Sequence, residues 1–204
     1  MIDYATFTNG LTTWQIVLRF VIVISLLISG LFISIIDFKK RIIPNTLVII
    51  WLILGITNLF TYIEVKEGGA IDWTGMILPA STFGVFILMG LGLFFWLGDS
   101  QFGGGDAKLM MTLGAFMGTM NHVFWFAIVS FLTALVVFAF AKIKHIKSIP
   151  AGPIYAFSAV VPYAFCSLPW YVGLTITLLF ISVFTISCYM LWKRGLIEPF
   201  ESNE

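Results

Sequence analysis

Seven long apolar stretches constrain this chain more than any other feature. They cover residues 14–36, 46–63, 75–97, 109–120, 123–141, 150–168 and 170–192, and short polar connections separate them. A helix that crosses a lipid bilayer needs about 20 predominantly apolar residues. Charged residues make up only 10% of the chain, whereas soluble domains carry about a quarter. We therefore predict an all-α, polytopic membrane helix bundle whose apolar surface faces the lipid bilayer.

The number of spans depends on the fourth stretch. Residues 109–120 are few for an upright span, so we expect this stretch to be tilted, partly embedded, or extended backward through Asp106. The bundle then has about seven spans, or six if this stretch does not cross. No lysine or arginine precedes Arg19, unlike the basic start of a cleaved signal peptide, so we expect the first stretch to be retained. Residues 1–204 should form a single membrane-embedded domain.

The basic residues predict the orientation of the bundle. Alternating spans place most of them on one side of the membrane: Lys39, Lys40, Arg41, Lys108, Lys142, Lys144, Lys147, Lys193 and Arg194. Only Lys66 and Arg19 belong to the opposite side. Because connections rich in lysine and arginine stay in the cytoplasm, we expect a cytoplasmic C-terminus and an N-terminus outside. The chain is then a multi-pass protein of the cytoplasmic membrane.

Three aspartates lie beside predicted membrane helices. Asp37 ends the first apolar stretch, Asp99 follows the third, and Asp106 closes a run of three glycines. The other carboxylates of the chain fall in terminal or connecting stretches. An ionisable side chain at membrane depth is energetically unfavourable, so each such residue is a functional hypothesis. Asp99 has no glycine run immediately before it and is the weaker candidate.

Two carboxylates without a competing nucleophile indicate paired-carboxylate chemistry. In such a pair, the ionised acid takes a proton from water and the protonated acid polarises the scissile carbonyl. Close carboxylates do not both ionise easily, so they share one proton. Asp37 and Asp106 both fall on the predicted cytoplasmic face. Three glycines would let an extended substrate backbone approach Asp106 closely: Gly103, Gly104 and Gly105.

Each of the two aspartates also has a structural explanation. Asp106 would lie at the start of a helix, where a carboxylate is favourable, as an ordinary cap after a flexible loop. Asp37 would be an interfacial acid paired with Lys39, Lys40 or Arg41. The sequence around Pro44 predicts a turn that opens the second helix. Taken singly, these residues leave both explanations open.

Other hydrolytic chemistries lack their residues in this chain. The two histidines, His122 and His145, do not form the His-Glu-x-x-His motif of zinc proteases, and we expect both to be solvated. Gly-x-Ser-x-Gly does not occur. Cys166 and Cys188 lie in apolar stretches, where packing is their expected role. We expect no metal and no other cofactor, and a net charge of +1 argues against a nucleic-acid partner.

Two sequence motifs, one that begins at Asp37 and a later one that includes Asp106, resemble the prepilin peptidase family of membrane aspartic proteases. The first is Asp37, followed by a basic stretch and Ile-Pro-Asn at residues 43–45. The second runs over residues 103–109 and is similar to the family's Gly-x-Gly-Asp-x-Lys-Leu signature. Residues 148–153 resemble a third, weaker family stretch that opens a late helix. The resemblance covers roughly residues 20–165.

The resemblance implies that Asp37 and Asp106 are the catalytic pair, with Pro44, Asn45 and Lys108 in supporting positions. It also implies cleavage of short, basic leader peptides from type IV pilin-like precursors at the cytoplasmic face of the membrane. Larger family members carry a cytosolic segment with paired cysteines before the first catalytic aspartate and also methylate the new N-terminus. No cysteine precedes Asp37. We therefore expect no soluble methyltransferase segment, as in short peptidase-only members that serve tight-adherence pili, or in archaeal preflagellin peptidases.

Two other functions stay open from the residues alone. In a small transporter or channel subunit, Asp37 and Asp106 would bind a cation or relay protons. Matching halves with inverted repeats would favour transport, and the sequence shows none. The other alternative is an inactive structural subunit of a secretion assembly. Replacement of either aspartate by asparagine separates these functions, because only a peptidase would lose leader cleavage while still being expressed.

Overall fold

Seven α-helices form most of the chain that the structure describes. The computed structural model describes residues 13–40, 42–65, 70–101, 104–143 and 151–193. The helices are α2 (Thr13–Lys40), α3 (Asn45–Phe60), α4 (Ile77–Gln101), α5 (Gly104–Leu113), α6 (Met120–Ile143), α7 (Gly152–Ser167) and α8 (Trp170–Lys193). Two 3-10 turns, η1 (Thr74–Met76) and η2 (Gly114–Phe116), lie before α4 and after α5. A hairpin of two very short antiparallel strands, β1 (Glu64–Val65) and β2 (Ile71–Asp72), is the one addition to the expected all-α fold within these residues.

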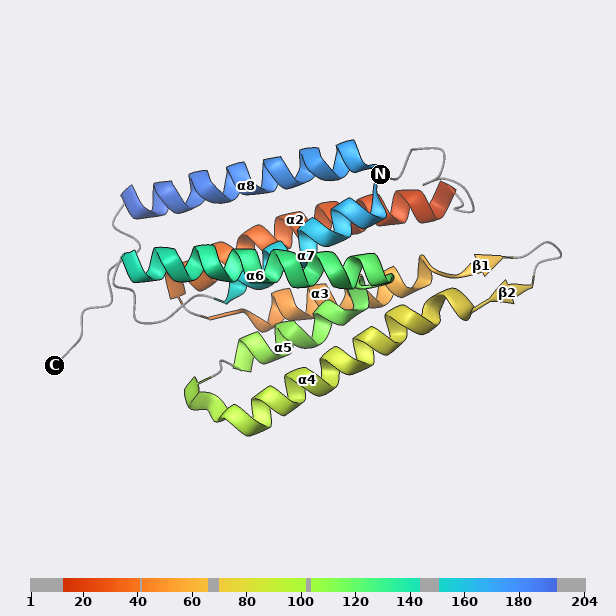
Figure 1. The fold of residues 1–204 in the computed structure, drawn as a ribbon, viewed down its shortest axis with the longest axis horizontal. Helices are drawn as coiled ribbons and strands as arrows, with labels where there is room; N and C mark the ends of the chain where they lie inside the picture. Colours follow the sequence, from red (N-terminus) through yellow and green to blue (C-terminus); the bar gives the residue numbers. More distant parts are fainter. Residues whose placement is uncertain (1–12, 41, 66–69, 102–103, 144–150, 194–204) are drawn as a thin grey trace.

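The helices run back and forth along one long axis, so their termini gather at two ends of the bundle (Figure 1). At one end α2, α4, α6 and α8 finish, while α3, α5 and α7 begin; we call this the aspartate end. At the other end α3 leads into the β1–β2 hairpin, and α7 gives way to α8; we call this the hairpin end. Asp37, near the end of α2, and Asp106, near the start of α5, therefore share one end of the bundle, as the alternation of spans predicted.

The outer surfaces of the long helices are apolar. Within the described part of the chain, three segments are long and apolar enough to cross a bilayer: Thr13–Asp37, Thr74–Phe95 and Met120–Ala139. Large apolar side chains project from them, such as Leu88, which is 70% exposed, and Phe95, which is 78% exposed. Such extensive apolar surface is unfavourable in water, so it fits a lipid surrounding.

The expectation of about seven spans is met only in part. Each predicted stretch overlaps an α-helix, but Asn45–Phe60 and Trp170–Ile186 are shorter apolar segments among the residues described. Helix α5 has ten residues, which gives a length of about 15 Å, or about half of the hydrocarbon core of a bilayer. It begins at Gly104, so the fourth stretch extends backward through Asp106, which was one of its three predicted alternatives.

Helix α7 lies at the centre of the bundle, in contact with α2, α6 and α8. Its contact with α2 uses small residues, because a Cβ added to Gly30 would lie 3.4 Å from the Cβ of Ala156. Small residues let two helices approach closely inside a membrane. Larger side chains fill the rest of the core, among them the fully buried Trp51, Tyr163 and Phe180.

The turn that follows α5 packs closely on α4. A Cβ on Gly114 would lie 2.8 Å from the Cα of Phe83, so a larger residue would push the two segments apart. The hydroxyl of Thr82 is 2.9 Å from the carbonyl oxygen of Gly114 and 3.0 Å from that of Met117. These contacts fix the far end of α5 and thereby the direction in which its first turn points.

A group of buried polar side chains lies toward the hairpin end. We call it the hairpin-end cluster, and it consists of Arg19, Asn58, Tyr62, His122, Tyr163 and Ser167. The Tyr163 hydroxyl donates to Oδ1 of Asn58, and Nδ2 of Asn58 donates to the Ala115 carbonyl at 2.9 Å. Arg19 donates to the Thr61 carbonyl at 3.3 Å, and its guanidinium lies 5.1 Å from the centre of the Tyr62 ring. Of the buried side-chain atoms described, Nε of Arg19 and the Tyr62 hydroxyl have no hydrogen-bond partner.

The expectation that His122 is solvated is wrong, because its side chain is only 2% exposed. Its Nδ1 lies 2.6 Å from the Thr119 hydroxyl, and its Nε2 lies 3.1 Å from the Ser167 hydroxyl. His122 lies in the short connection between the apolar stretches 109–120 and 123–141, which suggested a surface site. The packing of α6 against α7 instead turns the imidazole inward. His145 lies outside the described residues.

Candidate active site

Asp37 lies in the last turn of α2 and is 5% exposed. Its Oδ2 accepts a hydrogen bond of 2.8 Å from the backbone N–H of Gly152. Gly152 is the first residue of α7, where a backbone N–H has no acceptor within its own helix. The bond therefore satisfies a free donor of α7 and a buried oxygen of α2 at the same time.

Gly152 has no room for a side chain. An added Cβ would lie 2.9 Å from the Cβ of Asp37, 3.0 Å from its Oδ2 and 3.1 Å from Cγ2 of Ile33. Any residue larger than glycine would therefore displace either the Asp37 carboxylate or the start of α7. The close approach of these two backbones sets where the Asp37 side chain can lie.

Asp106 is the third residue of α5 and is partly buried. A carboxylate is favourable there, because the first turn of a helix carries the positive end of its dipole. Gly104 and Gly105 form the same turn, so they are helical and not part of a loop. Gly103 lies outside the described residues.

The two described glycines differ in the space around them. A Cβ on Gly105 would lie 3.0 Å from the Cβ of Ile43 and 3.3 Å from the Ile43 carbonyl oxygen, which is tight. A Cβ on Gly104 would meet only a ring carbon of Phe94, at an ordinary 3.5 Å. The close backbone contact at Gly105 is thus made by the chain itself, whereas the surroundings of Gly104 are comparatively open.

The predicted supporting residues lie together beside α5. Pro44 has an extended backbone and immediately precedes α3, as the predicted turn requires. Asn45 opens α3, and its Oδ1 accepts a hydrogen bond of 3.2 Å from the Lys108 ammonium group. This exposed contact joins the start of α3 to the first turns of α5.

Tyr155 of α7 lies within electrostatic range of both aspartates. The charges of Asp106 and Asp37 both act on its hydroxyl, so the carboxylates from α5 and α2 lie close to one side chain of α7. Tyr155 is one turn beyond Gly152 and therefore lies on the same face of the helix. Neither residue was assigned a role from the sequence. The available signal was the stretch at residues 148–153, which includes Gly152 and resembles a family stretch that opens a late helix.

The remaining candidates contribute less to this geometry. The Asp99 side chain lies outside the described part of α4. Among the residues that the structure describes, no group of three or more His, Cys, Asp or Glu side chains could hold a metal ion. Independence from metal stays a prediction. Cys166 is a free cysteine, and the Cys188 side chain lies outside the described residues.

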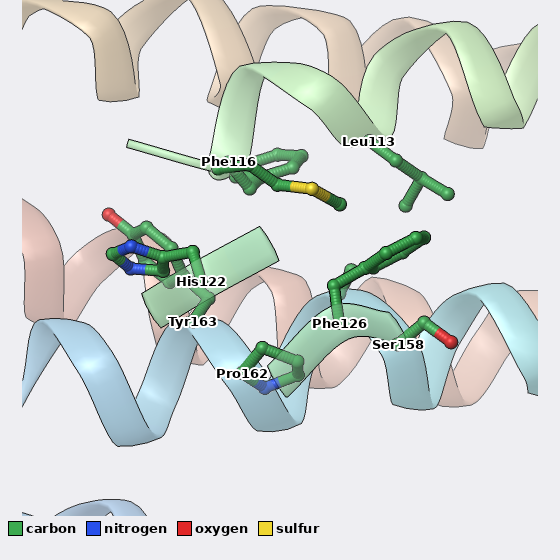
Figure 2. A pocket seen from close by; sticks show the side chains of 9 residues that line it. Leu113, Phe116, His122, Phe126, Ser158, Pro162 and Tyr163 are labelled. Carbon is green, nitrogen blue, oxygen red and sulfur yellow. The ribbon is translucent and has the colours of Figure 1, made fainter. Parts of the chain in front are cut away.

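A small internal cavity lies away from the aspartates (Figure 2). Its volume is about 10 Å³, close to the least that can hold one water molecule. The residues that line it are Leu113, Phe116, Met117, His122, Phe126, Ser158, Ala159, Pro162 and Tyr163. Neither Asp37 nor Asp106 is among them, so this cavity is separate from the candidate active site and far too small for a peptide.

The comparison with protein families agrees with the motifs. Residues 21–138 match the type IV leader peptidase family, a range that contains both Asp37 and Asp106. No curated protein and no solved structure gives a significant match to the chain. The matched range ends within α6 and covers more than half of the chain. The chain therefore belongs to the type IV leader peptidase family, a family of membrane-bound, aspartic-type peptidases.

Proposed function

We propose that the protein is an endopeptidase that removes leader peptides from type IV pilin-like precursors, with Asp37 and Asp106 as its catalytic pair. The observation that carries this proposal is the contact of Asp37 with the first turn of α7, at the end of the bundle where α5, with Asp106 in its first turn, also begins. Asp37 accepts a hydrogen bond from Gly152, and both charges act on the Tyr155 hydroxyl. Family membership supports the reaction class.

Two neighbouring carboxylates can divide the work of amide hydrolysis. With one proton between them, the ionised carboxylate accepts a proton from water while the protonated one donates its proton to the scissile carbonyl oxygen. The water oxygen bonds to the carbonyl carbon. When the tetrahedral intermediate collapses, the proton taken from water passes to the leaving amine and the carbonyl proton returns to its carboxylate. The pair ends the cycle with one proton, as it began.

The first turn of α5 is the proposed site for the extended cleavage segment. Gly104 supports this assignment, because the space beside its Cα is open apart from Phe94. A glycine there lets a substrate backbone approach the neighbouring Asp106. Gly103 belongs to the same proposed strip, while Gly105 contributes through its close packing on Ile43.

We assign the aspartate end to the cytoplasmic face of the membrane. Lys39, Lys40 and Lys108 are exposed at this end, whereas Arg19 is buried toward the hairpin end. Lysine-rich connections stay in the cytoplasm, which supports this orientation. The hydrophobic helix of the precursor would then stay in the membrane beside the bundle, with its basic leader at the cytoplasmic surface.

The test compares three aspartate substitutions in membranes that contain an epitope-tagged, pilin-like precursor. We expect Asp37→Asn and Asp106→Asn each to lower cleavage by about 10³-fold or more, since a pair that acts as a unit fails when either member is lost. Asp99→Asn is the matched control and should cleave like the unchanged protein. The measurement is the ratio of precursor to mature product, normalised to folded enzyme.

Normal cleavage by either Asp37→Asn or Asp106→Asn would overturn the assignment of the pair. An inactive Asp99→Asn together with an active Asp106→Asn would show that the wrong second aspartate had been chosen. Loss of ion flux across vesicles in the asparagine variants, without any change in cleavage, would favour the transport function instead.

A further inference from the structure

The first turn of α7 holds Asp37 through its backbone. The Gly152 N–H donates to Oδ2 at 2.8 Å, and the absent side chain of Gly152 leaves room for the carboxylate. Helix α7 lies beyond residues 21–138, the range that matches the family. The family comparison therefore assigns no role to this turn, although it contacts Asp37 of the proposed catalytic pair.

Tyr155 lies one turn further along the same face of α7, close enough for its hydroxyl to feel the charges of both aspartates. Tyr155 is partly buried, and the charges of Asp106 and Asp37 both act on its hydroxyl. The next residue, Ala156, packs against Gly30 of α2, which fixes the rotation of this part of α7. A phenol keeps its proton up to about pH 10, so this hydroxyl is a hydrogen-bond donor under physiological conditions.

We propose that Tyr155 is a positioning residue of the aspartate pair, and that it acts together with the backbone N–H of Gly152. In this arrangement Gly152 fixes Asp37, and the Tyr155 hydroxyl donates to one oxygen of the ionised carboxylate and directs the other oxygen toward water. The inference rests on the proposed peptidase function. It requires no covalent step at Tyr155, and the proton count of the reaction is unchanged.

An ionised carboxylate in an apolar bundle needs donors that hold it in one orientation. Hydrogen bonds to a charged acceptor are stronger than those between neutral groups. Two donors from a single turn of α7 would restrain the pair more rigidly than flexible lysine side chains, because a helix backbone and a phenol ring have few rotatable bonds. A correctly oriented base shortens the path of the proton from water, which raises kcat more than it alters substrate binding.

Tyr163 offers a matched comparison on the same helix. It lies eight residues beyond Tyr155, about 12 Å along the helix axis, and its hydroxyl donates to Asn58 in the hairpin-end cluster. Phenylalanine at either position removes one hydroxyl and keeps the ring. A purely structural role for both tyrosines would make the two variants alike, with lower stability and an unchanged pH dependence of cleavage.

The test uses the full chain in lipid nanodiscs and an epitope-tagged, pilin-like precursor with a basic leader. Values of kcat and KM are measured across pH for the unchanged protein, Tyr155→Phe and Tyr163→Phe. We expect Tyr155→Phe to lower kcat about tenfold, the loss of one hydrogen bond to a charged group, with little change in KM. The acidic limb of its pH profile should move to higher pH, because a carboxylate that loses a donor takes up a proton more readily.

Glycine variants test the backbone part of the inference. Gly152→Ala should lower kcat by about 10²-fold, because a small displacement of a catalytic group has effects of that order. Gly84→Ala is its control, since a Cβ at Gly84 has nothing within 4 Å. If Gly152→Ala does not fold, the tyrosine comparison still decides the proposal.

The outcomes separate this inference from the proposed function. If Asp37→Asn and Asp106→Asn are inactive while Tyr155→Phe keeps the kcat and pH profile of the unchanged protein, the inference is overturned and the peptidase assignment stands. An equal effect of Tyr155→Phe and Tyr163→Phe on the pH profile would also overturn it. If both asparagine variants cleave normally, the peptidase assignment itself fails, and the role of Tyr155 fails with it.

Discussion

The two ends of the bundle both bury polar groups in apolar surroundings, but with different chemistry. The hairpin-end cluster consists of neutral or cationic side chains. Some bond to one another, as Tyr163 does to Asn58 and His122 to Ser167, and others bond to backbone carbonyl groups. The aspartate end has two acids on separate helices and a backbone donor from a third. Hydrogen-bonded neutral groups are tolerated inside a helix bundle. A carboxylic acid there is energetically unfavourable and is therefore a candidate for a functional role. The comparison indicates that one end stabilises the fold and the other serves chemistry.

Some residues at the aspartate end have a packing role and not a chemical one. Gly105 and Gly152 are both required by contacts within the chain, with Ile43 and Asp37 respectively. A glycine beside an acid can thus have a packing role even where the acid has a functional one. Among the described glycines of this end, Gly104 has the open surroundings that a substrate would need.

Among the substitutions that test this difference between the two ends, Gly105→Val is expected to have the largest effect on cleavage. Gly105→Val should reduce cleavage by about 10²-fold per folded molecule, because displacement of Ile43 moves the first turn of α5 and with it Asp106. Folded yield should also fall, since the new side chain overlaps the backbone of residue 43. Both quantities are measured, by monodisperse yield in detergent and by precursor cleavage.

Gly92→Val is the control for that substitution. A Cβ at Gly92 has nothing within 4 Å, so valine there adds a β-branched side chain to a helix without a clash. Equal cleavage by the Gly105 and Gly92 variants would show that the first turn of α5 does not belong to the active end.

A smaller effect, on stability alone, is expected at the hairpin end. Asn58→Ala removes the acceptor of the Tyr163 hydroxyl and the donor to the Ala115 carbonyl, and should lower the free energy of unfolding by about 1–3 kcal/mol. Cleavage per folded molecule should stay unchanged. Denaturation in mixed micelles measures the stability, with Asn121→Ala as an exposed control. A loss of kcat with no loss of stability would reverse the roles assigned to the two ends.

No effect is expected from a chelator. The proposed chemistry uses two carboxylates and water, so cleavage by the purified protein should be the same with and without EDTA. Two aspartates alone also make a poor site for zinc, which favours histidine and cysteine ligands. Inhibition by EDTA that added metal reverses would contradict the paired-carboxylate mechanism.

Much of the helical fold could be predicted because lipid requires long apolar stretches. Each of the seven stretches overlaps a helix. Most boundaries shift by a few residues, as where α4 continues to Gln101, but α5 covers Gly104–Leu113 and not residues 109–120. The motifs placed Asp37 and Asp106 at helix termini on one face. The motifs also named Asn45 and Lys108 as supporting residues, but not the contact between them that the structure shows.

The remaining features depend on packing between distant segments. Gly152 meets Asp37 only because α7 lies against α2, and small residues such as those at 151–153 are common wherever membrane helices pack. The burial of His122 likewise depends on how α6 meets α7. A pattern along the chain reports the period of a helix but not which neighbour its face will contact.

The bond between Gly152 and Asp37 has a consequence for biosynthesis. It joins residues 115 positions apart, and α2 leaves the ribosome long before α7. Until α7 inserts, a nascent chain lacks the backbone donor that holds Asp37, even when both aspartates are already in the membrane. Assembly of this end of the bundle is therefore completed by a late helix, so the Asp37 carboxylate reaches its final position only after translation has passed α7.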